Sequence, residues 1–139
     1  MGINASLNAK NGDSLATVVD FRGLFAWGLR LYELDSTACL KLIDPYADTV
    51  FDHAQLPRLL SELETARATI TAQDLEVAKK EYFERAKTWW GPPQGEAEVR
   101  DYIDSLSLVE LQRQFDRIID LVRDAIGRGP TIHVTFIGD

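Results

Sequence analysis

The sequence has few of the residues on which metal sites and disulfide bonds depend. Its 139 residues include one cysteine, Cys39, and two histidines, His53 and His133. A single cysteine cannot form a disulfide within the chain. One cysteine and two histidines, scattered along the sequence, are too few to form a zinc site. Cys39 lies in the apolar run ACLKLI, so we expect a buried side chain without a redox or catalytic role. The sequence predicts no cofactor and no metal ion.

Two further absences narrow the class of partner. No stretch is apolar over the length of a membrane helix, and the N-terminus lacks the regions of a signal peptide, so we expect a cytoplasmic protein without a membrane partner. Lys and Arg total 15 against 22 Asp and Glu, which gives a formal net charge of -7. Nucleic acid is not an expected partner, because phosphate binding depends on an excess of basic residues. A basic protein suits this charge better.

Alternating apolar residues predict strands near both ends of the chain. INASLNA and LATVVDF, joined by the Asn-Gly turn of KNGD, have the pattern of a β-hairpin. The terminal PTIHVTFIGD alternates in the same way and predicts a last strand, with Val134 toward the core and His133 away from it. Between them, ACLKLID (residues 38–44) is nearly continuous in apolar character and predicts a third strand that ends at Pro45.

Apolar residues at spacings of three and four predict a short helix over residues 22–34 and a block of helices over residues 57–127. The last helix has the clearest apolar stripe, with Ser107 as its cap and Gly127 at its end. GPPQG interrupts the block as an inter-helix loop. We therefore expect one α+β domain over residues 1–139, in two layers, with a mostly antiparallel four-stranded sheet and helices packed on one face.

The start of the helix that follows the third strand is open to two interpretations. Asp52 with Gln55 has the spacing of a capping box, and Phe51 with Leu56 has that of a hydrophobic staple. Pro57 comes one position beyond the first turn, where its ring meets a preceding carbonyl. Either DHAQL makes a separate tight turn or the helix begins at Pro57.

The stretch LIDPYADTVFDHAQL has aspartates at intervals of four residues, followed by a histidine. In a structural interpretation, Asp44 begins a turn, Asp48 bonds backbone amides within it and Asp52 caps the next helix. In a functional one, Asp44, Asp48 and His53 form a catalytic or ligand site. The spacing matches no calcium loop and no catalytic motif, which favours the structural interpretation. We assign no catalytic residue.

Two acidic surfaces and one tryptophan are candidate contacts for a partner protein, and the second surface consists of Asp48, Glu62 and Glu64. Three aspartates repeat every four residues on the outer face of the last helix, where Arg113, Arg117 and Arg123 partly offset their repulsion. One of two adjacent tryptophans must leave the buried helix face beside GPPQG. The candidate residues are Asp48, Trp90, Asp116, Asp120 and Asp124.

Two segments resemble an uncharacterised group of small acidic bacterial proteins. CLKLIDPYADTVFDHAQLPRLLSELE resembles a strand that runs into IDPYGDTVFN and then a Leu-rich helix. IHVTFIGD resembles the last strand of the group, which ends in FIGD. The sequence differs from that pattern at Ala47, where the group has glycine, and at Asp52, where it has asparagine.

The group is similar in type to immunity proteins, which neutralise bacterial toxins by binding them. The resemblance implies a non-enzymatic protein-binding module whose partner is a basic toxin. The alternative is a small enzyme or ligand-binding protein with a site near Asp44, Asp48 and His53. A third interpretation is a structural or regulatory subunit that uses the Trp90 edge. The sequence leaves the oligomeric state open.

Overall fold

The structure is a computed structural model that describes residues 2–32, 39–90 and 94–138; for residues 87–90, 94 and 95 it describes the backbone alone. The strands are β1 (Ile3–Asn8), β2 (Ser14–Val18), β3 (Asp48–Phe51) and β4 (His133–Gly138). The α-helices are α1 (Leu24–Leu31), α2 (Leu56–Thr69), α3 (Ala72–Trp90), α4 (Gln94–Asp104) and α5 (Leu108–Gly127). The predicted α+β class is confirmed.

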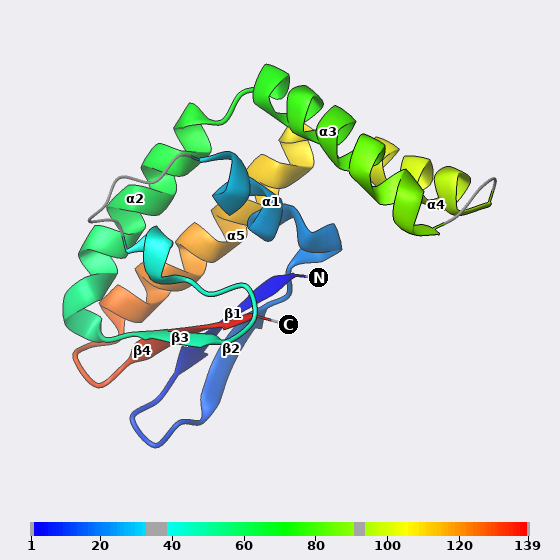
Figure 1. The fold of residues 1–139 in the computed structure, drawn as a ribbon. Helices are drawn as coiled ribbons and strands as arrows, with labels where there is room; N and C mark the ends of the chain where they lie inside the picture. Colours follow the sequence, from blue (N-terminus) through cyan, green and yellow to red (C-terminus); the bar gives the residue numbers. More distant parts are fainter. Residues whose placement is uncertain (1, 33–38, 91–93, 139) are drawn as a thin grey trace.

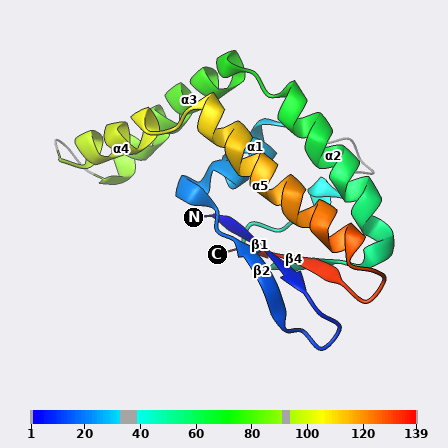
Figure 2. The same cartoon turned by 180° about the vertical axis from the view of Figure 1, so that it is seen from behind.

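The strands form an antiparallel sheet in the order β2-β1-β4-β3, so the first and last strands of the chain lie at its centre (Figure 1). The predicted hairpin and last strand are confirmed. Ala5 pairs with Phe136 and Leu7 with Val134, and these four side chains are fully buried on the helix side of the sheet. The helices lie on this side in both views (Figure 2). The molecule therefore has the predicted two layers.

Helix α5 provides the centre of the core, as its long apolar stripe predicts. The ring of Phe115 packs against Phe25 of α1, with 5.1 Å between the ring centroids. α1 comes so near that a Cβ atom at Gly28 would lie 2.2 Å from Cε1 of Phe115. Gly28 weakens the intrinsic helix propensity of α1, and the structure shows that it permits this close approach.

The prediction of a third strand over residues 38–44 is wrong. Within the described part of that segment, Leu40–Leu42 forms a 3-10 turn, and the third strand is β3. The Leu40 N–H donates to the Glu62 carboxylate at 3.1 Å instead of joining a ladder. The run is apolar because parts of this irregular turn are buried in the core. β3 has four residues of which Phe51 alone is buried, so its alternation is too short to stand out.

Asp52 caps a separate turn, which decides between the two predicted starts of α2. Its carboxylate accepts the Gln55 N–H at 3.1 Å, and the Gln55 side chain accepts the Asp52 N–H at 3.0 Å. His53–Gln55 forms a 3-10 turn, and α2 then begins at Leu56. Pro57 falls in the first turn of α2, where its missing N–H leaves no helical bond unmade.

Helices α3 and α4 lie side by side and project beyond the sheet (Figures 1 and 2). A small cluster of Ala86, Val99 and Ile103 joins the two helices, with Tyr82 and Tyr102 packed against it. The GPPQG loop that the sequence predicts between them lies largely outside the described residues. The α3–α4 pair is thus an arm that packs on α1 and has its own apolar contacts.

Candidate functional site

The turn before β3 and the end of β4 fit closely against each other. The Asp44 carboxylate accepts the Tyr46 N–H at 2.8 Å, which is the predicted turn-forming role of this aspartate. The Gly138 N–H donates to the Ala47 carbonyl at 3.2 Å. A Cβ atom at Gly138 would lie 2.4 Å from the carbonyl carbon of Pro45. The DPYAD and FIGD segments are therefore one structural unit, which their separation in the sequence conceals.

β3 lies at the edge of the sheet, so half of its backbone N–H and C=O groups face away from β4. In an antiparallel ladder, residue pairs that share backbone hydrogen bonds alternate with pairs that do not. Gly138 and Ala47 form a hydrogen-bonded pair, so the next pair, Ile137 and Asp48, is not hydrogen-bonded. The backbone N–H and C=O groups of Asp48 and Val50 consequently point to the open side of β3. No strand pairs with that side within the residues that the structure describes. Such an edge is able to accept a strand from another chain.

Acidic and apolar side chains flank this edge. Val50 is 57% exposed and Tyr46 is 72% exposed, and Ile137 lies beside Asp48 on the neighbouring strand. The aspartates of the segment are all exposed. None of them forms an ion pair with a described residue. We call this the β3 edge surface; it consists of Asp44, Tyr46, Asp48, Val50, Asp52 and Ile137.

His53 lies next to this surface but is held by another element. Its Nε2 atom is 3.2 Å from the carbonyl oxygen of Ile126, near the end of α5. No hydrogen bond or ion pair in the described part of the chain joins His53 to Asp44 or Asp48. Among the described residues no group of three or more His, Cys, Asp or Glu side chains is arranged to hold a metal ion. His53 therefore links the capped turn to α5.

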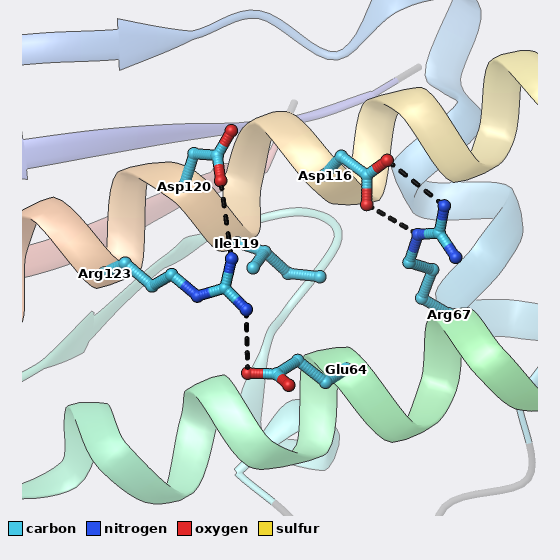
Figure 3. Close-up of a pocket in the computed structure, with 6 residues that line it drawn as sticks. All are labelled: Glu64, Arg67, Asp116, Ile119, Asp120 and Arg123. Carbon is cyan, nitrogen blue, oxygen red and sulfur yellow. Dashed lines mark hydrogen bonds and ion pairs between the residues drawn. The ribbon is translucent and has the colours of Figure 1, made fainter.

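Two aspartates of the predicted column on α5, Asp116 and Asp120, pair with basic side chains beside α2 (Figure 3). Arg67 of α2 forms two hydrogen bonds with the Asp116 carboxylate, at 2.5 and 3.2 Å. Arg123 lies 3.5 Å from Glu64 and 3.7 Å from Asp120, so it bridges the two helices. These residues line a shallow polar pocket. We call it the α2–α5 face; it consists of Glu64, Arg67, Asp116, Ile119, Asp120 and Arg123.

The partners of this column differ in part from those that the sequence suggests. Arg123 pairs with Asp120 as expected, but Arg113 binds Glu110 and Arg117 binds Gln114. The third aspartate of the column pairs with an arginine just beyond α5, at 3.1 Å. Every aspartate of the column thus has a cation beside it. Trp90 ends α3, and its side chain lies outside the described part of the chain, so its role stays a prediction.

Sequence reasoning did not single out Asp20, which is buried at the start of α1. Its carboxylate accepts three backbone N–H groups, from Ile3 at 2.9 Å, Phe25 at 2.7 Å and Ala26 at 3.1 Å. Burial raises the pKa of the Asp20 carboxyl, and these donors act in the opposite direction. Asp20 therefore links β1 to α1 through buried hydrogen bonds to both elements.

Comparison of this chain with protein-family models, curated proteins and solved structures gives no match. Within the described residues, no helix is both long enough and apolar enough to span a membrane. The function is therefore inferred from the surfaces and cavities of this chain.

Proposed function

We propose that this protein is a non-enzymatic protein-binding module, an immunity-type protein that neutralises a bacterial toxin, and that its β3 edge surface binds a basic partner. The observation that carries the proposal is the combination of an edge of β3 that no described strand covers, exposed apolar side chains and three aspartates that form no ion pair with a described residue. The segments that resemble the bacterial group, DPYAD and FIGD, meet at this surface.

Each component of the β3 edge surface supports a different step of binding. Unpaired carboxylates attract a basic partner over a distance and raise its association rate. Exposed apolar groups such as Tyr46 and Val50 gain free energy when a partner removes them from water. The free N–H and C=O groups of Asp48 and Val50 accept an added strand. β2, the opposite edge of the sheet, has no charged residue along its length.

The α2–α5 face is the second candidate for the same partner. It holds two residues of the predicted contact set, Asp116 and Asp120, but both carboxylates already have arginine partners. Binding through it requires a partner to compete with those ion pairs. We therefore rank the β3 edge surface first.

A capture experiment with two triple variants tests the proposal. The edge variant carries Asp44→Asn, Asp48→Asn and Asp52→Asn, and asparagine keeps the side-chain oxygens that bond the turns at Asp44 and Asp52. The control variant carries Asp116→Asn, Asp120→Asn and Asp124→Asn, which removes the same charge from α5. The proposal predicts that the parent and the control variant retain one basic protein from a lysate of the source cells, and that the edge variant loses it.

Toxin neutralisation requires a second measurement on the captured protein. We expect the captured protein to stop growth when it is produced alone in bacterial cells, and co-production of the parent chain to restore growth. Rescue by the edge variant at the same level as by the parent would contradict the assigned surface. A captured protein without any toxicity would contradict the immunity function.

A further inference from the structure

A cavity of about 520 Å³ lies where the α3–α4 arm meets α1 and the start of β1. It is separate from the β3 edge surface, and no residue of that surface lines it. The volume falls within the range of ordinary small-molecule sites, about 300–1,000 Å³. Its walls come from three parts of the chain, so no single segment reveals it. The residues that matter for its chemistry are Arg22, Trp27, Arg30, Tyr82, Glu98 and Tyr102.

Aromatic rings form the walls, and hydrogen bonds fix their orientation. The Trp27 and Tyr82 rings meet edge to face with 5.3 Å between centroids, and Tyr82 lies 6.0 Å from Tyr102. The Trp27 Nε1–H donates to the Tyr102 hydroxyl oxygen at 3.0 Å, and the Tyr102 hydroxyl donates to the Arg22 carbonyl at 3.0 Å. A planar ligand therefore meets rings that are already ordered, which lowers the entropic cost of binding.

Two arginines, Arg22 and Arg30, line the cavity. Neither Arg22 nor Arg30 forms an ion pair with a described residue, and Arg30 lies over the Trp27 ring at 5.8 Å. Arg22 has φ 55°, the one positive φ outside glycine in the described chain. Such a conformation costs free energy in a non-glycine residue and recurs at binding sites. In a protein with a net charge of -7, two guanidinium groups at one cavity, neither ion-paired with a described residue, favour an anionic ligand.

The acidic residues that line the cavity do not cancel this preference. The carboxylate of Asp20 is engaged by backbone N–H groups, including those of Phe25 and Ala26. Glu98 is exposed to water, where its charge is screened. Two arginines and one exposed glutamate thus line the cavity together with the engaged Asp20.

The geometry points to a binding site for a small planar aromatic carboxylate. Its ring lies against Trp27, Tyr82 and Tyr102, and its carboxylate accepts hydrogen bonds from Arg22 and Arg30. Arginine suits this role because its fork of N–H donors matches both oxygens of a carboxylate. The site is independent of partner binding at the β3 edge surface.

Two-dimensional NMR with 2-naphthoate as the probe tests the site in the full chain. The indole N–H signal of Trp27, assigned with Trp27→Phe, reports on the cavity because this N–H bonds Tyr102. We expect a saturable shift of that signal with 2-naphthoate. Neutral 2-naphthamide and cationic 2-naphthylmethylamine should bind at least about tenfold more weakly, since a charge-assisted hydrogen bond is worth about that factor or more. Equal binding of the amide or the amine would overturn the inference.

Single substitutions at the entrance give an independent result. Arg30→Gln and Arg22→Gln should each weaken 2-naphthoate binding by about tenfold. Arg113→Gln removes the same charge from the exposed face of α5 and should leave the affinity unchanged. Unchanged affinity in both entrance variants would overturn the site. Absence of any shift at Trp27 in the folded parent would do the same.

Discussion

Asp52 shows how a single side chain at the end of β3 organises the next element. Its carboxylate and the Gln55 side chain each accept a backbone N–H, so two donors at the start of the turn are satisfied together. Asp52→Ala should lower the free energy of unfolding by about 0.5–2 kcal/mol, the usual cost of a lost N-cap. Denaturant titration measures this change. Asp48→Ala, at an exposed position in the same segment, is the control and should stay within about 0.5 kcal/mol. Equal midpoints for the parent and Asp52→Ala would show that the cap is absent.

Cys39 offers a second test at the scale of one residue. The side chain is buried, as predicted, and burial together with the nearby Glu62 carboxylate raises the pKa of its thiol. The thiolate is the reactive form, so iodoacetamide should label Cys39 far more slowly in the folded protein than in denaturant at the same pH. Mass spectrometry over time gives both rates. Equal rates would contradict the burial of Cys39.

The residues that the sequence predicts correctly are those with local signals. The capping box at Asp52 spans four consecutive positions, and the cap at Ser107 accepts the Glu110 N–H in the same way. Asp20 has no such signal, because one of its donors belongs to β1 and the others to α1. The cavity beside α1 was missed for the same reason. Its rings at Trp27, Tyr82 and Tyr102 meet only after the α3–α4 arm has packed on α1.

At the scale of elements, the close packing of α1 on α5 depends on one glycine. Gly28→Ala places a methyl group against the ring of Phe115, and we expect the free energy of unfolding to fall by about 1–3 kcal/mol. Gly127→Ala is the matched control, since nothing lies within 4 Å of its Cβ position. It should leave the stability unchanged or raise it by up to about 1 kcal/mol, because alanine favours a helix. Thermal melts of both variants decide this, and greater stability of Gly28→Ala would contradict the packing.

The spacing of apolar residues predicts most helices and strands correctly, and the wrong prediction of the third strand has a physical cause. The apolar patterns of α5 and of the segments at the ends of the chain predict a helix and strands, and the structure confirms these elements. The prediction of the third strand fails because Cys39, Leu40 and Ile43 are buried in a turn that bonds Glu62, while β3 is short and mostly exposed. Burial in the core and membership of the sheet are separate properties, and an apolar run reports on the first.

At the scale of the whole molecule, the net charge predicts the sign of a partner but leaves its location open. The charge of α5 is nearly balanced, since its acids Glu110, Asp116, Asp120 and Asp124 alternate with three arginines. Pairs such as Arg67 with Asp116 join different helices, so the sequence pattern does not show them. The unpaired aspartates of the β3 edge surface become visible only when those pairs are known. Because the aspartates on α5 are ion-paired and those of the β3 edge surface are not paired with a described residue, we place the proposed contact on β3.

The most direct test is the association rate with the captured basic partner, measured by stopped flow over a series of salt concentrations. Removing charges that steer a partner slows association and makes it less sensitive to salt. We predict slower and less salt-sensitive association for the edge variant with Asp44→Asn, Asp48→Asn and Asp52→Asn. The control variant with Asp116→Asn, Asp120→Asn and Asp124→Asn should associate at the rates of the parent. An edge variant that associates with the rate and salt dependence of the parent would contradict binding through the β3 edge surface.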